Sequence, residues 1–286
     1  MSKLLLIDDE EDVRYSFQRI FDSPEIEFTW RRGQCSDRPQ TQTKIIMKKN
    51  LLFGTMALLA GSLMAADSSP KDDVKNAAAA LGHQTNYTWH ATVEVPADAQ
   101  FKPGPTDGKT EPGGYTTLSI SFGDNTTEAV IKGTNGAVKT DDGWKTLAEA
   151  MKDDGNGGFN PTTFIARMVQ NYKVPAVEAA SLAEAAKELK KDTNSISGDL
   201  TEAGAKELLS FRRRANSGDG PTITNPKGSV KFWVKDGKLV KYQYHIQGAV
   251  SFNGNDRDVD RTTTVEISDV NTTKISAPDD ARKKLE

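Results

Sequence analysis

The most constraining feature of this chain is an alternation of apolar and polar residues that recurs in separate stretches. Over 87–95, aromatic and aliphatic residues occupy every second position and polar residues lie between them. The pattern returns over 240–247, and shorter stretches of it cover 118–122, 230–234 and 263–267. Because successive side chains of a strand point to opposite faces, this period of two predicts strands with one buried face and one wet face. Such strands favour an antiparallel sheet.

Turn signals separate several of the predicted strands. Asn135 and Asp142 are each followed by glycine, and so is Asp236. These pairs supply the positive φ angles that tight hairpin turns require. The pair at Asp236 is the clearest signal, because alternating residues flank it on both sides. We therefore expect consecutive strands to be joined as antiparallel hairpins.

The middle of the chain predicts helices. Asn160 is an N-cap residue followed by proline, and an apolar stripe at helical spacing follows over 164–172. The segment Ser181–Glu184 has the pattern of a capping box, and Thr201 is suited to cap a third helix. Helices grouped between two sets of strands can pack together on one face of the sheet.

These patterns predict an α+β fold, an antiparallel sheet packed on a central group of helices; the resemblance given below implies that the sheet is curved into a half-barrel. Shorter helices are expected over 74–81 and after Ala277-Pro278. The predicted fold occupies residues 67–286, which contain no cysteine because Cys35 lies upstream. This part of the chain must therefore be stabilised by its core, without disulfides.

A pattern typical of a signal peptide precedes the predicted fold, over residues 47–66. Two lysines follow Met47, an apolar run covers 51–60, and small residues end at Ala65 and Ala66. A buried core helix is the alternative, and it fits poorly because the run is apolar on every side. We expect export by the Sec machinery, cleavage near Ala65 or Ala66, and a periplasmic or secreted protein without a lipid anchor.

The first residues have a different character. Residues 3–9 contain a short apolar run, 4–7, that ends in Asp8 and Asp9; helical spacing follows over 13–21, and a second strand begins at Ile26. This stretch resembles the start of a response-regulator receiver domain, and the resemblance implies that Asp8 and Asp9 help to hold Mg²⁺. The remaining strand–helix units of a receiver are missing, so we expect residues 1–30 to be a truncated, non-functional fragment. Residues 31–46 form an irregular junction.

The predicted fold also resembles a known family. The order of strands, then helices, then an Asp-Gly hairpin, with Ala277-Pro278 near the end, is similar to the LolA/LppX-like lipoprotein-carrier superfamily of bacterial envelopes. The resemblance covers roughly residues 74–285. It implies a half-barrel that carries a lipid-like ligand and is not an enzyme.

Large apolar side chains are the candidate ligand contacts. If the sheet and helices enclose a cavity, an apolar guest would contact aromatic rings there. Those rings could equally fill a core, since large aromatic residues usually pack. The candidates are Trp89, Trp144, Phe164, Met168, Trp233, Tyr242 and Tyr244.

Signals for other chemistry are weak. His90 and His245 lie on the polar phase of predicted strands, and no catalytic or nucleotide-binding motif is present. Residues 253–260 suggest a Ca²⁺ loop, but they depart from the EF-hand pattern and are better explained as a polar hairpin. The run Arg212–Arg214 follows a predicted helix, whose dipole favours cations there. Because no such motif is present, we expect no catalytic residues and no cofactor. The net charge of -3 gives no overall attraction to nucleic acid, so we expect no nucleic acid partner.

The sequence thus predicts an exported, non-enzymatic envelope protein that binds or carries a lipid-like hydrophobic ligand. One alternative is a structural or interaction protein with a filled core, whose partner is another envelope protein. A second alternative is phosphorelay activity through residues 1–30.

Overall fold

The computed structural model describes residues 2–6, 26–30 and 68–286, except 100–101, 112, 124, 153–159, 211–220, 253–254 and 274–276. The chain divides into two compact units, residues 1–63 and 64–286. In the first unit, β1 (Ser2–Leu6) and β2 (Ile26–Trp30) pair in parallel, with Leu4 opposite Phe28. The two expected strands are confirmed. The expected helix over 13–21, Asp8, Asp9 and the segment 31–66 lie outside the described residues.

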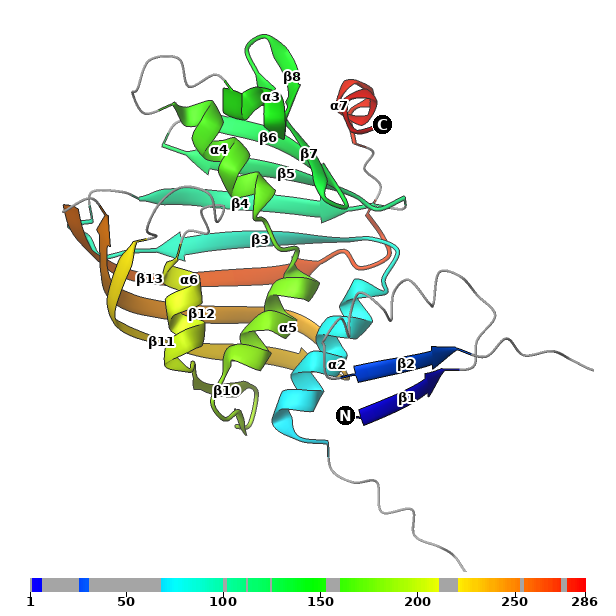
Figure 1. Cartoon of the computed structure of the whole chain (residues 1–286), viewed down its shortest axis with the longest axis vertical. Coiled ribbons are helices and arrows are strands. Elements are labelled where there is room, and N and C mark those ends of the chain that lie inside the picture. The colour runs from blue at the N-terminus through cyan, green and yellow to red at the C-terminus, as the bar shows by residue number, and fades with distance from the viewer. Residues whose placement is uncertain are drawn as a thin grey trace, which may run out of the picture. The chain divides into compact units, whose positions relative to one another are not determined.

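The second unit is built on one open antiparallel sheet of eleven strands (Figure 1). In spatial order they are β8 (Gly143–Thr146), β7 (Asn135–Thr140), β6 (Asn125–Lys132), β5 (Tyr115–Phe122), β4 (Pro103–Thr110), β3 (Tyr87–Glu94), β13 (Asn255–Ser268), β12 (Lys238–Phe252), β11 (Thr222–Lys235), β10 (Ile196–Asp199) and β9 (Lys190–Lys191). The last long strand, β13, pairs with β3 and β12, and so joins the first group of strands to the second. The predicted α+β half-barrel is therefore confirmed.

The hairpins fit the predicted turns unevenly. Asp236 and Gly237 both have positive φ, 50° and 72°, and they connect β11 to β12 as expected. The β6–β7 turn lies two residues before the predicted pair, at Gly133 and Thr134, and Lys132 is opposite Asn135. There the positive φ, 60°, belongs to Gly133. Asn135-Gly136 was thus a misleading signal, because Gly133 meets the same conformational need earlier.

Six helices of the described region complete this unit. They are α2 (Pro70–Gly82), α3 (Leu147–Lys152), α4 (Pro161–Gln170), α5 (Pro175–Ala185), α6 (Glu202–Leu209) and α7 (Asp279–Leu285). The side chain of Asn160 caps α4 by accepting the Thr163 N–H, as predicted, and Thr201 caps α6 in the same way. None of these helices is long and apolar enough to cross a membrane.

The predicted capping box at Ser181–Glu184 is wrong. The helix starts earlier, at Pro175, because proline at the first helical position suits its fixed φ and missing N–H. Ser181 therefore lies inside α5, where its hydroxyl donates to the Val177 carbonyl at 2.9 Å. The helix ends at Ala185, one residue after the predicted box.

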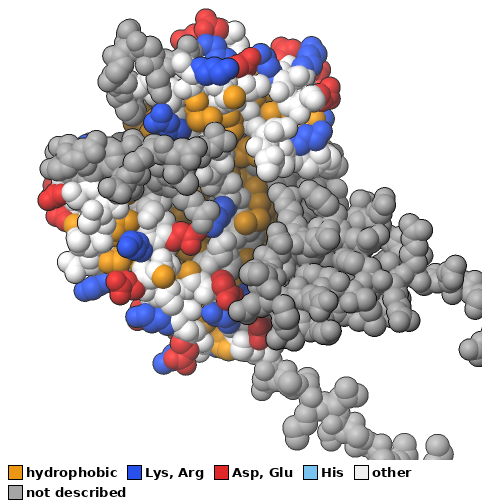
Figure 2. All heavy atoms as spheres, in the orientation of Figure 1, with side chains coloured by type: hydrophobic (Ala, Val, Ile, Leu, Met, Phe, Trp, Pro, Cys, Tyr) orange, Lys and Arg blue, Asp and Glu red, His pale blue; other side chains and the backbone are white. Residues whose placement is uncertain are grey.

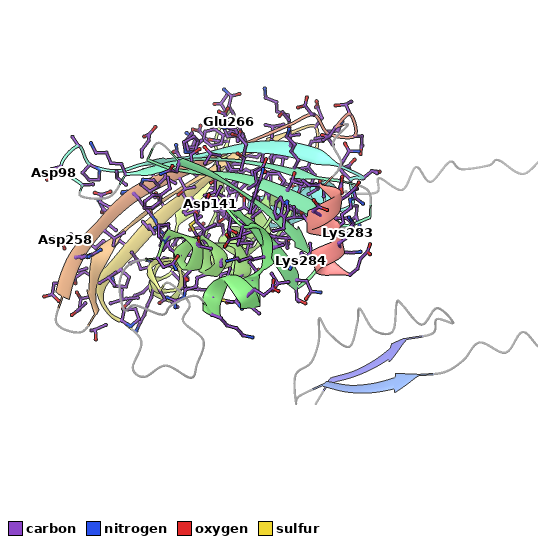
Figure 3. The ribbon with its side chains drawn as sticks, turned by 90° about the horizontal axis from the view of Figure 1, so that it is seen from above. Asp98, Asp141, Asp258, Glu266, Lys283 and Lys284 are labelled. Atoms are coloured by element: carbon purple, nitrogen blue, oxygen red, sulfur yellow. The ribbon has the colours of Figure 1, made fainter. Side chains whose placement is uncertain are left out.

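The two faces of the sheet differ, as the period of two predicted. On β12, Tyr242, Tyr244 and Ile246 are buried toward the helices, and the residues between them are more exposed. Figure 3 shows the sheet curving over the helices, with Glu266 on the outer side. The outer face is not wet everywhere, because the terminal helix α7 packs on part of it. Ala281 and Leu285 of α7 pack with Tyr115 in a small cluster apart from the main core. That cluster covers the outer face near β6, β7 and β8.

The other helices form two groups over the inner face (Figure 1). The first group, α3 and α4, packs against β6, β7 and β8. The second group consists of α2, α5 and α6, of which α2 and α6 contact β11 and β12. A link of only four residues, 171–174, joins α4 to α5. The middle strands β3 and β4 therefore lie beneath the boundary between the two groups.

Candidate ligand-binding site

Aromatic side chains fill the inner face at the boundary between the helix groups. The ring centroids of Tyr87 and Trp89 are 5.5 Å apart, and the Tyr172 ring stacks on Trp89 at 6.4 Å. Phe122 of β5 and Phe164 of α4 form an edge-on pair at 5.8 Å. We call these five residues the aromatic seam. Figure 2 shows hydrophobic side chains at the surface near the middle of this face.

Trp89 is the best-anchored member of the aromatic seam. Its indole N–H donates to the Tyr172 hydroxyl at 2.8 Å, which ties β3 to the link between α4 and α5. The ring lies directly over its cross-strand neighbour Gly108, where an added Cβ would come within 2.0 Å of indole atoms. Only glycine leaves room for the indole in this position. The seam is therefore held by one hydrogen bond and one close backbone approach.

A carboxylate lies on the same face. Glu178 of α5 accepts a hydrogen bond from the Tyr242 hydroxyl at 2.6 Å on one oxygen, and from the Tyr244 hydroxyl at 3.2 Å on the other. We call these three residues the Glu178 cluster. They connect the helix layer directly to β12.

Burial dominates the electrostatics of both groups of residues. It raises the pKa of Glu178, and the two tyrosine hydrogen bonds, Lys173 and Arg261 oppose that shift. Burial likewise raises the pKa of Tyr242 well above its usual range, and the nearby Glu178 charge adds to this. The pKa of Tyr87 is raised to about 12 by burial, despite a backbone hydrogen bond to Ala176. The tyrosines are therefore neutral hydrogen-bond donors at physiological pH.

The structure brings together four of the seven candidate ligand contacts. Trp89, Tyr242 and Tyr244 lie on the helix-covered side of the sheet, and Phe164 of α4 packs against the same core. Met168 lies on α4, and 37% of its surface is exposed.

The idea that all seven residues share one lining is wrong for two tryptophans. Trp144 packs against the cluster under α7, on the outer face. Trp233 also faces outward, where the amines of Lys231 and Lys241 lie 5.2 and 5.3 Å from its ring centroid. Its neighbour Phe232 takes the inward position and pairs with Tyr242. The cause is strand alternation, which sends neighbouring residues to opposite faces.

The sequence interpretation missed Glu178 and the role of Tyr172. A signal for Glu178 was present, because it is the single charged residue in the apolar stretch 174–183. An acid in such a stretch is expected to be exposed unless it has hydrogen-bond partners. Those partners, Tyr242 and Tyr244, are more than 60 residues away in the sequence.

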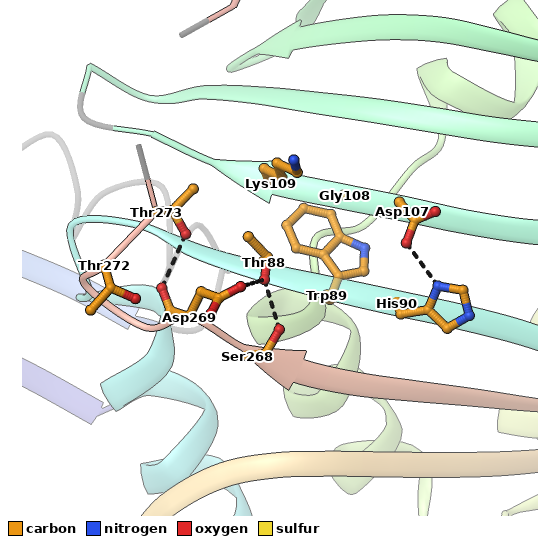
Figure 4. A pocket seen from close by; sticks show the side chains of 10 residues that line it. All are labelled: Thr88, Trp89, His90, Asp107, Gly108, Lys109, Ser268, Asp269, Thr272 and Thr273. Atoms are coloured by element: carbon orange, nitrogen blue, oxygen red, sulfur yellow. Dashed lines mark hydrogen bonds and ion pairs between the residues drawn. The ribbon is translucent and has the colours of Figure 1, made fainter. Parts of the chain in front are cut away.

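A hollow of about 320 Å³ lies where β3, β4 and the end of β13 meet (Figure 4). Its polar groups already bind one another. Nδ1 of His90 lies 2.7 Å from Oδ1 of Asp107, and the Thr88 hydroxyl donates to the Asp269 carboxylate at 2.9 Å. Thr88 is also 2.8 Å from the Ser268 hydroxyl. Within the described residues, no group of three or more His, Cys, Asp and Glu side chains is arranged to hold a metal ion.

The remaining polar candidates are also placed by the structure. His245 lies on the outer face, where its Nε2 is 2.8 Å from Asp260. This hydrogen bond lowers the pKa of Asp260. Residues 255–260, part of the Ca²⁺ candidate, belong to strand β13, while residues 253–254 and Arg212–Arg214 lie outside the described residues.

No protein-family model matches the chain, and no curated protein matches it. Solved structures do show similarity. The lipoprotein LppX of Mycobacterium tuberculosis aligns over 72% of this chain and 97% of its own, with 11% identity and a TM-score of 0.39. LprF of Mycobacterium bovis aligns over 75% of this chain and 100% of its own, with 11% identity and a TM-score of 0.38. A LolA superfamily protein of Nitrosomonas europaea aligns over 73% of this chain and 96% of its own, with 8% identity and a TM-score of 0.30.

Proposed function

We propose that residues 67–286 form an exported, non-enzymatic protein that binds or carries a lipid-like ligand between the sheet and the helices. One observation carries this proposal. The helix layer is split into two groups joined by the short link 171–174, and aromatic side chains, rather than a helix, cover the sheet at the boundary. Separation of the groups would expose apolar side chains on the inner face while each group kept its own contacts with the sheet.

The aromatic seam supplies suitable chemistry for such a ligand. Burial of an alkyl chain contributes about 0.8 kcal/mol for each CH₂ removed from water. Phe122, Phe164 and Trp89 offer apolar ring surface for this contact, and the Trp89–Tyr172 hydrogen bond is the polar contact that opening must break. Such a bond contributes only about 1 kcal/mol net, so a few buried CH₂ groups would offset its loss.

The alternative of a structural or interaction protein with a filled core is favoured by a different observation. Trp89 is only 2% exposed, and every buried side-chain polar atom among the described residues has a hydrogen-bond partner. A core of this kind is complete without a ligand. The two functions differ in whether the seam opens, which can be measured.

Quenching of tryptophan fluorescence by a brominated fatty acid tests the proposal. The quencher acts on contact, and Trp89 is one of four tryptophans. In a variant that keeps only Trp89, with the other three changed to phenylalanine, we expect saturable quenching. The matched control keeps only Trp233, which faces outward. Equal quenching of both variants would indicate surface adsorption, and quenching of neither would favour the filled core.

Export is a separate part of the proposal and has its own test. It rests on the signal pattern over 47–66 and predicts that the protein in the envelope fraction starts at Ala66 or Asp67. Intact mass and N-terminal sequencing measure this directly. A protein starting at Met1 would argue against export and would bring Asp8 and Asp9 back into consideration. Incubation with acetyl phosphate would then show whether the phosphorelay alternative has any basis, and we expect no phosphoryl uptake.

A further inference from the structure

A group of lysines surrounds a tryptophan on the outer face of the sheet, near the turn of the β11–β12 hairpin. Lys231, Trp233 and Lys235 occupy alternate positions of β11, so their side chains leave the sheet on the same side. On β12, Lys241 is opposite Trp233, and Lys238 is opposite Lys235. We call these five residues the hairpin patch.

The tryptophan of the hairpin patch stays at the surface among cations. Trp233 is only partly buried, and the amines of Lys231 and Lys241 lie 5.2 and 5.3 Å from its ring centroid. The amine of Lys241 also donates to Glu266 at 2.7 Å, and Figure 3 shows Glu266 on the outer side of the sheet. The ring therefore offers apolar area and an indole N–H on the face that the helix layer does not cover.

Most of the positive charge of the hairpin patch is unpaired. The hairpin as a whole, residues 222–252, contains five lysines and one acid, Asp236. Lys241 has its ion pair with Glu266, whereas the other three lysines of the patch are exposed and form no ion pair with a residue that the structure describes. Lys235 and Lys238 are directly opposite each other, and like charges in that position destabilise a sheet. The patch thus concentrates positive charge in a chain whose net charge is -3.

The geometry of the hairpin patch suits a flat partner. Neighbouring strands are about 4.8 Å apart and alternate residues of a strand about 7 Å apart, so the five side chains leave an area about 15 Å across in one direction. The sheet curves over the helices, which makes this outer face convex (Figure 3). A convex face offers no groove to a peptide or a small molecule, but it can contact a surface with all five side chains at once.

We infer that the hairpin patch docks this protein on the surface of a bilayer that contains anionic phospholipids. The lysine amines contact the phosphate groups, while their methylene stems and the Trp233 ring enter the boundary between headgroups and acyl chains. Tryptophan and lysine are the side chains suited to that boundary, because each combines an apolar body with a polar end. The inference goes beyond the proposed function, since it concerns the outer face and requires no ligand between the sheet and the helices.

Flotation with lipid vesicles tests the inference in the whole chain. One set of vesicles is phosphatidylcholine alone, and the other is two parts phosphatidylcholine to one part phosphatidylglycerol. We expect the wild-type protein to bind the second set at least about tenfold more tightly, and added salt should weaken this binding. In the double variant Lys231→Gln with Lys235→Gln the affinity for the second set should fall by more than about tenfold, because each lysine near an anionic surface contributes about fivefold.

The matched control is the double variant Lys152→Gln with Lys206→Gln, which changes the net charge equally. Both lysines are exposed and lie on helices of the inner face, α3 and α6. We expect this variant to keep the wild-type affinity for the second set within about twofold, because charges beyond a Debye length are screened. If it loses as much affinity as the patch variant, general attraction between charges explains the binding and the inference fails.

A contact measurement shows whether the hairpin patch is the surface that meets the lipid. In the variant that keeps only Trp233, vesicles with phosphatidylglycerol brominated on its acyl chains should quench the fluorescence. Binding of this variant without quenching places the contact elsewhere and overturns the inference. A dissolved brominated fatty acid should not quench Trp233, because a single anion lacks the summed contacts of a surface.

The wild-type comparison needs no variant, so it decides the matter even if a substitution prevents folding. Equal binding of the wild-type protein to both sets of vesicles, or binding to neither, overturns the inference. Circular dichroism checks the fold of each variant. The proposed function is judged separately, by quenching of Trp89 with the dissolved fatty acid, so either idea can fail while the other stands.

Discussion

Substitution of Gly108 by alanine tests the packing on which the aromatic seam depends. The added methyl group would lie 2.0 Å from two carbon atoms of the Trp89 ring, far inside any van der Waals contact. The indole must therefore move, and overpacking of this kind costs about 1–3 kcal/mol. Displacement of the ring also breaks the Trp89–Tyr172 hydrogen bond, at a further cost of about 1 kcal/mol. We expect Gly108→Ala to lower the free energy of unfolding by about 2–4 kcal/mol.

Urea denaturation, followed by far-ultraviolet circular dichroism, measures this loss. In thermal unfolding of a domain of this size, 1 kcal/mol corresponds to roughly 2–4 °C in Tm, so Tm should fall by about 4–16 °C. The control is Gly82→Ala at the end of α2, where the new Cβ would lie 3.6 Å from Ala176 in ordinary contact. That change should be neutral or stabilising, because alanine is the better helix former.

A double-mutant cycle gives the result that can refute the reasoning. With Trp89→Ala as background, the ring is gone and Gly108→Ala should cost almost nothing, since alanine suits a strand better than glycine. The two changes should therefore couple strongly, as contacting residues do. If Gly108→Ala is equally costly with and without Trp89, the indole is not the group that excludes a side chain at position 108.

Two further changes test other parts of the fold. Because burial raises the pKa of Glu178, the folded state holds its proton more tightly than the unfolded state does. The stabilisation that this proton gives to the folded state is therefore fully present below the unfolded pKa of 4.5. It is lost as the pH rises toward the raised pKa of the folded state. Denaturation at several pH values above 4.5 should show that wild type loses stability relative to Glu178→Gln, and parallel curves would contradict this. Separately, Arg282→Met leaves buried Glu111 without its ion pair, and we expect a loss of about 3 kcal/mol together with faster proteolysis of α7. Unchanged protection of α7 would show that its apolar contacts suffice.

Local patterns were enough to predict most of the sheet, because each depends on neighbours in the sequence. The alternation over 87–95 and 240–247 correctly assigned inner and outer faces on β3 and β12. The cap at Asn160 was found for the same reason, since its hydrogen bond spans three residues. The start of α5 was missed because Pro175 and Ser181 both offered start signals, and packing of α5 against α2 favours the earlier one.

The candidate site was predicted less well, because it depends on which face the helices cover. Trp233 already alternated with the apolar positions 230, 232 and 234, so its own strand pattern placed it outward. It was grouped with Tyr242 by residue type alone, although cross-strand register pairs Tyr242 with Phe232 and Trp233 with Lys241. Phase along a strand is thus a stronger guide to a shared lining than aromatic character.

Glu178 shows what a pattern within one element cannot supply. Its position in an apolar stretch marks it as either exposed or paired, but the choice depends on β12, which lies more than 60 residues later. The two tyrosines that pair with it are two residues apart on one strand, so they share the inner face and reach both carboxylate oxygens. A lone acid in an apolar helix and a Tyr-x-Tyr strand elsewhere are individually ordinary. Together they specify a partly buried polar contact that joins α5 to β12.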